Sequence, residues 1–168
     1  MFTWEYTDSH MGIFKKIVIE SSTKIETTPE KIWNFFSKIE DNYKRWHPED
    51  HHFWHWTKGK PLEVGSKIDS EETVGGHKGG IKATVIESVK NKKIALKPAW
   101  PLSFMCPKLE WIMETKDNNT YFVAQTHYKF GKLFLTFKKN TVDQILYLTK
   151  KHMDEEGENL KKILEKES

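Results

Sequence analysis

The chain has 168 residues, which suits a single domain whose core is large enough to surround a small-molecule cavity. Charged residues make up 30% of the chain and the formal net charge is +3, so the composition gives no reason to expect nucleic acid as a partner. The lone Cys106 excludes an internal disulfide framework, and no apolar run is long enough to span a bilayer. We therefore expect a cytoplasmic protein.

The N-terminal residues lack the basic and then apolar order of a signal peptide. We interpret residues 1–12 as a polar leader before a single domain of residues 13–168. The β-branched residues between Ile13 and Glu26 predict a first strand. Thr28-Pro29-Glu30 then supplies a capping threonine, a proline suited to the first helical position and a glutamate that favours the positive end of the helix dipole. With the helical spacing of the apolar residues that follow, this predicts a short pair of helices up to Trp46.

Six further strands are predicted, because short β-like segments alternate with turn residues rich in glycine, asparagine and lysine. Their expected ranges are His52–Thr57, Ser66–Val74, Lys82–Val89, Ile94–Lys97, Leu109–Thr115 and Tyr121–Phe130. In the last strand, alternation places His127 on a solvent-facing side. A long helix is expected over about Thr141–Glu165, with Thr141 and Gln144 at the spacing of a capping box. This order predicts an α+β domain in which a curved antiparallel sheet wraps around the final helix and encloses a cavity.

The final helix interrupts its apolar stripe with two polar residues. The stripe consists of Val142, Ile145, Leu146, Thr149, Met153, Leu160, Ile163 and Leu164. At about 100° per residue, Glu156 falls near the middle of the stripe and His152 at its edge. A buried carboxylate must be neutralised, paired with a cation or bound to a metal. Because His152 and Glu156 stand one helical turn apart, they favour two ligands of one ion, although a local hydrogen bond between them is the alternative.

Other candidate ligands occur earlier in the chain. Four histidines, His47, His51, His52 and His55, follow the predicted helix pair closely, and histidine is the commonest metal ligand. Strand alternation puts Glu72 on the more apolar face of its segment, together with Ile68 and Val74. One histidine of this cluster, Glu72 and the helical pair could form a shell of two histidines and two carboxylates.

Aromatic residues make up 13% of the chain and include seven tryptophans. Such side chains form good walls for flat organic ligands. Trp54 belongs to the histidine-rich segment, and Trp111 shares a strand face with Leu109 and Met113. We expect Trp54 and Trp111 to bind substrate if they face the cavity.

The order of elements resembles the helix-grip fold of the START/Bet v 1-like (SRPBCC) superfamily. Within it, Tyr43-Lys44-Arg45-Trp46-His47-Pro48-Glu49-Asp50-His51 and His152-x-x-x-Glu156 resemble the diacetylphloroglucinol hydrolase family. These are zinc enzymes that cleave the carbon–carbon bond between an acyl group and a phenolic ring. The resemblance extends from about Lys24 to Leu164.

The resemblance also implies roles for particular residues. It makes His51, Glu72, His152 and Glu156 the metal ligands, and it makes Tyr43 a catalytic residue because a tyrosine of the family stands eight positions before the first histidine. The chain departs from the pattern in having Trp54 three residues after that histidine, where the family has asparagine. A further catalytic histidine of the family has no match.

We therefore expect a metal-dependent hydrolase that cleaves a carbon–carbon bond of a small aromatic or cyclic ketone. Zinc is the expected metal, although oxygen-rich ligation also suits Mn²⁺ or Fe²⁺. Two alternatives stay open: a non-catalytic module that binds a small hydrophobic ligand or lipid, and a metal-free polyketide cyclase or dehydratase with His152 and Glu156 as an acid–base pair. Either a monomer or a homodimer is compatible with the sequence.

Overall fold

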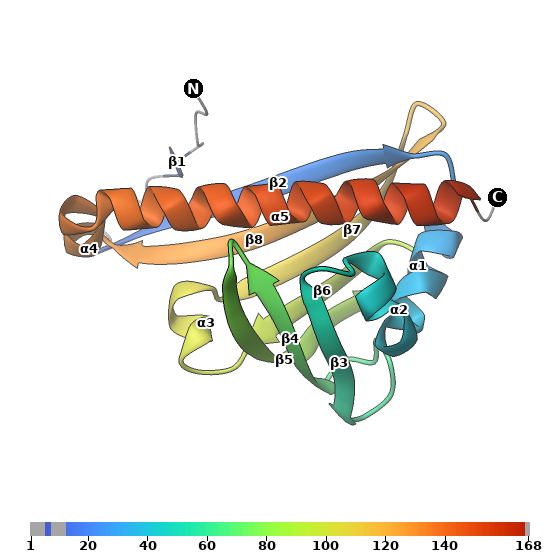
Figure 1. The fold of residues 1–168 in the computed structure, drawn as a ribbon, viewed down its shortest axis with the longest axis horizontal. Helices are drawn as coiled ribbons and strands as arrows, with labels where there is room; N and C mark the ends of the chain where they lie inside the picture. The colour runs from blue at the N-terminus through green and yellow to red at the C-terminus, as the bar shows by residue number, and fades with distance from the viewer. Residues whose placement is uncertain (1–5, 8–12, 167–168) are drawn as a thin grey trace.

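An antiparallel sheet curves around one long helix (Figure 1). The computed structural model describes residues 6–7 and 13–166. The strands are β1 (Tyr6–Thr7), β2 (Phe14–Ile25), β3 (His51–Lys58), β4 (Lys67–Val74), β5 (His77–Val89), β6 (Lys93–Pro98), β7 (Lys108–Lys116) and β8 (Asn119–Gly131). The helices are α1 (Pro29–Ser37), α2 (Ile39–Trp46), α3 (Leu102–Met105), α4 (Lys132–Phe137) and α5 (Lys139–Lys166).

The sheet has the order β1-β2-β8-β7-β6-β5-β4-β3, so the meander from β3 to β8 is completed by β2, which pairs with β8. Helix α5 crosses the molecule along its long axis, with α1 and α2 near its C-terminal end and α3 and α4 near the other end (Figure 1). The predicted α+β helix-grip fold is confirmed. Among the described residues, no helix is both long and apolar enough to cross a bilayer.

Most predicted elements lie within a few residues of the observed ones, and the differences have local causes. Strand β5 begins at His77 rather than Lys82, because β4 pairs with it through the weak strand formers Gly79 and Gly80. The short helices α3 and α4 were not predicted. Of the proposed leader, Tyr6–Thr7 pairs with β2, and its other residues lie outside the described part of the chain.

The helix start predicted before Pro29 is confirmed, since the Thr28 hydroxyl accepts a hydrogen bond from the Lys31 amide. The capping box predicted at Thr141 is wrong. Helix α5 already begins at Lys139, directly after α4, and the amide of Val142 donates to the carbonyl of Lys138. The two helices follow one another so closely that Thr141 lies inside the first turn of α5.

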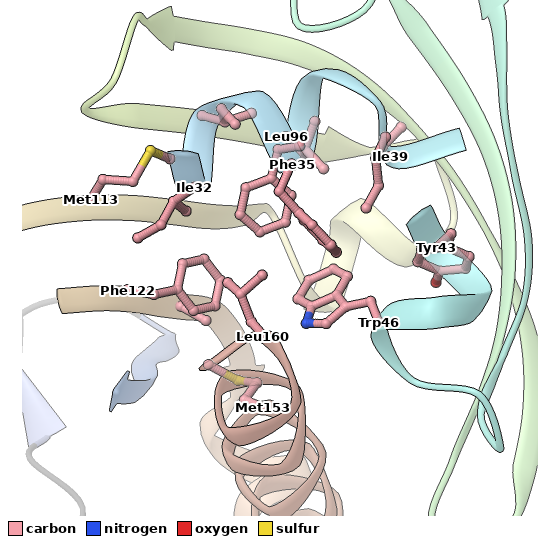
Figure 2. Close-up of a cluster of buried hydrophobic side chains, with 14 of the residues drawn as sticks. Ile32, Phe35, Ile39, Tyr43, Trp46, Leu96, Met113, Phe122, Met153 and Leu160 are labelled. Carbon is pink, nitrogen blue, oxygen red and sulfur yellow. The ribbon is translucent and has the colours of Figure 1, made fainter. Parts of the chain in front are cut away.

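Trp46 connects α2 to the middle of α5. Its ring is completely buried, and its indole nitrogen donates to the backbone carbonyl of Glu156 at 2.9 Å. Figure 2 shows this ring among Phe35 of α1, Phe122 of β8 and Leu160 of α5. The aromatic core therefore fixes the backbone of α5 at the residue that the sequence singled out as a buried carboxylate.

Gly157 allows α5 to approach β2 closely. A Cβ atom at this position would lie 2.2 Å from Oγ1 and 3.1 Å from Cβ of Thr23. Gly157→Ala should therefore lower the free energy of unfolding by about 1–3 kcal/mol through overpacking, although alanine is the better helix former by about 1 kcal/mol. Urea unfolding in the wild-type and Thr23→Ala backgrounds measures this cost. A smaller cost in the Thr23→Ala background is expected, and an equal cost in both would contradict the argument.

His127 lies on the less buried face of β8, as predicted, with its side chain 24% exposed, but it is engaged in an ion pair. Its ring nitrogen Nε2 lies within hydrogen-bonding distance of Glu110, which is only 4% exposed. Lys93 and Lys108 also pair with this carboxylate, at 2.7 and 2.8 Å. Burial alone would raise the pKa of Glu110, but the hydrogen bonds from Lys108, Lys93 and His127 outweigh it and lower the pKa from 4.5 to about 2.

This depressed pKa predicts an acid-sensitive contribution to stability. Because the folded state holds Glu110 ionised, its contribution is present above about pH 4.5 and is lost as the pH falls towards 2. Glu110→Gln should lower the free energy of unfolding by about 1–3 kcal/mol at pH 7. Denaturant titrations should show the gap between variant and wild type closing between pH 4.5 and 2. A gap that does not change with pH would show that the charge of Glu110 is unimportant.

Candidate metal centre

Four elements bring the predicted site residues together. The register of β3 and β4 pairs His51 with Glu72, so the two residues are direct cross-strand neighbours. Helix α2 carries Tyr43 next to them, and α5 carries His152 and Glu156. All five residues were predicted from the sequence to form the site, and they meet where α5 packs against α2, β3 and β4.

The ligand atoms of His51, His152 and Glu156 form a compact buried group, all within 4.8 Å of one another. Nε2 of His51 lies 3.1 Å from Oε1 of Glu156, and Nε2 of His152 lies 3.8 Å from the same oxygen. Glu72 is at the margin of the group, with its Oε2 4.0 Å from Nε2 of His51. Two ligands of a tetrahedral ion with bonds of about 2.1 Å lie about 3.4 Å apart, so these separations bracket that value.

The histidine nitrogens at the centre of the group lack hydrogen bonds. Nε2 of His51 and both ring nitrogens of His152 are buried without a hydrogen-bond partner among the described residues. Buried polar atoms are normally satisfied, and those that are not require an explanation. A cation that binds the lone pairs of both rings would provide one.

The tautomer of His51 suits a metal ligand. Its Nδ1 donates to the backbone carbonyl of Tyr43 at 3.0 Å, which leaves the lone pair of Nε2 directed at Glu156. The imidazole also stacks on the Tyr43 ring, with centroids 3.9 Å apart. His51 is 1% exposed, so its orientation is set by packing as well as by this hydrogen bond.

Electrostatics of the metal-free site favour the uptake of positive charge. Burial, followed by the charge of Glu156, raises the pKa of Glu72. Burial disfavours the charged form of His51, but the nearby carboxylates of Glu156 and Glu72 outweigh it and raise the pKa of His51 overall. Without a cation, this pocket therefore retains protons that a divalent ion could replace.

Tyr43 is held as a neutral hydrogen-bond donor. Burial, and then the charges of Glu72 and Glu156, raise its pKa well above the ordinary value, so its hydroxyl keeps its proton. That hydroxyl donates to Oε2 of Glu72 at 2.8 Å. Tyr43 thus contacts the imidazole of His51 through its own ring and backbone carbonyl, and the carboxylate of Glu72 through its hydroxyl.

The group lies in the wall of a cavity of about 450 Å³. Tyr43, Glu72, His152 and Glu156 line it, whereas His51 lies behind them. Trp54 and Trp111, expected from the sequence to bind a ring, line the same cavity. Trp54 is 4% exposed, and Trp111 stacks on Phe36 with centroids 4.4 Å apart. A cavity of this size can enclose a small aromatic molecule.

The sequence left His47 and His51 as alternatives before the resemblance was applied, and the structure separates them. His51 faces Glu72 and Glu156, whereas His47 lies beyond His152 beside Asp50 and Glu155. Reasoning from the apolar stripe missed this second group, because Glu155 lies outside the stripe. The one sequence feature that could have pointed to this group is the spacing of His47 and Asp50, which stand three residues apart.

Comparison with known proteins supports the fold and does not extend to activity. No protein-family model and no curated protein sequence matches the chain. The solution structure of the KanY protein has a TM-score of 0.68 at 17% identity, covering 92% of this chain and 99% of that chain. The crystal structure of the major latex-like protein 151 of Panax ginseng has a TM-score of 0.60 at 14% identity, covering 81% of this chain and 97% of that chain. The crystal structure of Ara h 8.0201 has a TM-score of 0.53 at 10% identity, covering 86% of this chain and 98% of that chain. At these identities the similarities show the shared fold alone, a curved antiparallel sheet around a long C-terminal helix.

Proposed function

We propose that the protein is a metal-dependent hydrolase, with zinc as the metal, that cleaves the carbon–carbon bond between an acyl group and the ring of a small aromatic or cyclic ketone. The observation that carries this proposal is the group of buried, unpartnered histidine nitrogens and carboxylates at the wall of an aromatic-lined cavity. A ligand bound in this cavity would lie directly against these nitrogen and oxygen atoms, where a bound metal ion could act on it.

The donor set fits zinc. His51 and His152 offer neutral imidazole nitrogens, and Glu72 and Glu156 offer two negative charges that balance a divalent ion. Nδ1 of His51 is already held by a backbone carbonyl, as is usual for a metal-bound histidine. A bound zinc ion would supply Lewis-acid polarisation of a carbonyl oxygen.

The remaining residues bind and orient the substrate. Trp54 and Trp111 hold a flat ring by contact with its faces or edges. The raised pKa of Tyr43 keeps its one hydroxyl proton in place, and when substrate binds this hydroxyl would turn from Glu72 to donate to a phenolic or carbonyl oxygen. The enclosed apolar walls exclude bulk water around the ring, which strengthens these polar contacts.

The cavity itself favours a second candidate, a non-catalytic carrier of a small hydrophobic ligand. Its lining includes the apolar residues Ile68, Leu96 and Leu109 beside the two tryptophans, and such a pocket can hold a ligand without chemistry. This candidate leaves the unpartnered histidine nitrogens unexplained. It predicts ligand binding that is insensitive to metal.

The experiment is a hydrolysis assay on the full chain with a panel of acylated phenols that carry the acyl group on a ring carbon. The reaction consumes water and yields a carboxylic acid and the deacylated phenol, and both products are quantified. We expect turnover with zinc, none after chelation, and recovery when zinc is restored. Turnover that survives chelation would favour a metal-free enzyme, and binding without turnover in both states would favour a carrier.

A further inference from the structure

A second group of metal-ligand side chains lies on the far side of His152. His47 follows the end of α2, Asp50 precedes β3, and Glu155 lies on α5, one position before Glu156. With His152 they offer four ligand atoms within 4.8 Å of one another. The rings of His47 and His152 stack with centroids 5.0 Å apart.

The distances in this group are too long for good hydrogen bonds and close to those between ligands of one ion. Nδ1 of His152 lies 3.4 Å from Oδ2 of Asp50, and Nδ1 of His47 lies 3.8 Å from the same oxygen. Nε2 of His47 lies 3.6 Å from Oε2 of Glu155. Ligands of an ion with bonds of about 2.1 Å are about 3.4 Å apart.

His47 is the strongest sign of a missing partner. Its side chain is 9% exposed, and both of its ring nitrogens are buried without a hydrogen bond among the described residues. Histidines packed in a core normally satisfy at least one ring nitrogen. The carboxylates of Asp50 and Glu155 flank this ring, so the lone pair of His47 points into a negatively charged environment.

The charge of the group is only partly balanced by lysine. Nζ of Lys151 lies 3.6 Å from Oε1 of Glu155, whereas Oε2 of that carboxylate faces His47. Within the described part of the chain, Asp50 forms ion pairs with His47 and His152 alone, and either histidine compensates charge only when protonated. A divalent cation would compensate both carboxylates without requiring protonation of the rings.

The two groups open to different sides of the molecule. The first faces the inner cavity, whereas His47, Asp50 and Glu155 line a separate surface groove of about 750 Å³. Glu155 is 44% exposed at its side chain and Asp50 is 25% exposed, so an ion could enter this group from solvent. His152 stands between the two groups, with Nε2 towards Glu156 and Nδ1 towards Asp50.

We propose that His47, Asp50 and Glu155 bind a second divalent transition-metal ion beside the first site. When the second ion binds one oxygen of Asp50, His152 would keep its proton on Nδ1, and the 3.4 Å separation from Oδ2 of Asp50 would shorten to a hydrogen bond. This arrangement orients His152 for the first ion and couples the two sites through one carboxylate. The mixture of imidazole and carboxylate ligands suits Zn²⁺. This second site goes beyond the proposed hydrolysis and does not depend on it.

The test is calorimetric titration of Zn²⁺ into the metal-free full chain. We expect two ions per chain in the wild type and one in Glu155→Gln and in Asp50→Asn/Glu155→Gln. Glu158→Gln, on the same helix and in the same groove, is the matched control and should retain two. His51→Ala should retain the second ion and lose the first. Circular dichroism checks that each variant is folded.

One ion in the wild type that is lost in His51→Ala but kept in Glu155→Gln would overturn the second site and leave the first intact. One ion in the wild type that is kept in His51→Ala but lost in Glu155→Gln would support the second site and overturn the first. Binding of two ions that is unchanged in Asp50→Asn/Glu155→Gln would also overturn the proposal, because the second ion would then lie elsewhere.

Discussion

Replacing Glu156 by glutamine is expected to weaken zinc binding strongly at the site that faces the cavity while leaving the metal-free protein folded. Glutamine has nearly the same shape, but it removes one of the two negative charges that balance the ion and offers His51 and the ion a neutral amide in place of the carboxylate. We expect the zinc affinity of this site to fall on the order of 100-fold or more, because even residues that only orient a ligand cost 10- to 100-fold. Calorimetry measures the loss directly.

The same variant has an unusual expected effect on stability. In the metal-free protein the charge of Glu156 raises the pKa of Glu72, so the two carboxylates disfavour one another. Glu156→Gln should therefore leave the free energy of unfolding unchanged or raise it by about 1 kcal/mol. Zinc at 100 times its dissociation constant should stabilise the wild type by about 2.7 kcal/mol and this variant by much less.

Glu158→Gln is the matched control, because Glu158 lies on the same helix but is exposed. It should retain both the zinc affinity and the stabilisation by zinc. If Glu156→Gln instead lost about 1–3 kcal/mol in the absence of metal, Glu156 would be a structural hydrogen-bond partner of His51 rather than a ligand.

Tyr43→Phe is expected to lower turnover of an acylated phenol by about 100- to 10,000-fold, the usual range for a positioned acid–base or proton-donating group. The variant retains the ring that stacks on His51 and the carbonyl that orients it, and it loses only the hydrogen bond to Glu72, so zinc affinity should fall by at most about 10- to 100-fold and turnover is compared at saturating zinc. Comparing kcat with zinc affinity in the same preparations separates a role in chemistry from a role in building the site.

Tyr128→Phe provides the control for that comparison. Tyr128 lines the same cavity, but its hydroxyl hydrogen-bonds to Thr149 at 2.7 Å rather than to Glu72. Its removal should change turnover only modestly. Equal losses in the two variants would indicate that any cavity hydroxyl supports the reaction, and the assignment of Tyr43 would fail.

The strands and the final helix could be predicted because their burial follows simple periods. Residues of β2 alternate between buried and exposed positions, and those of α5 follow the helical period that placed Glu156 inside the stripe. Glu156 is 8% exposed and His152 is 7% exposed, as that argument requires. Local patterns on single elements were therefore sufficient to find these two residues.

Relations between elements were harder to predict. Whether His47 or His51 faces Glu72 depends on the register of β3 against β4, which periodicity does not determine. Only the resemblance favoured His51. Spacing along the chain also cannot reveal long-range contacts. Examples are the hydrogen bond from the Trp46 indole to the Glu156 carbonyl and the approach of Glu155 to His47 and Asp50. Helix α4 was missed because it is short and has no side-chain cap.

Anomalous X-ray scattering from crystals of the full chain, measured on both sides of the zinc edge, tests the central claim most directly. We expect a zinc peak with ligand distances of about 2.0–2.2 Å to His51, His152, Glu72 and Glu156, in the wall of the cavity that Trp54 and Trp111 line. Zinc-soaked crystals with no peak between these four side chains, and with His51 still directed at an uncoordinated Glu156, would contradict it.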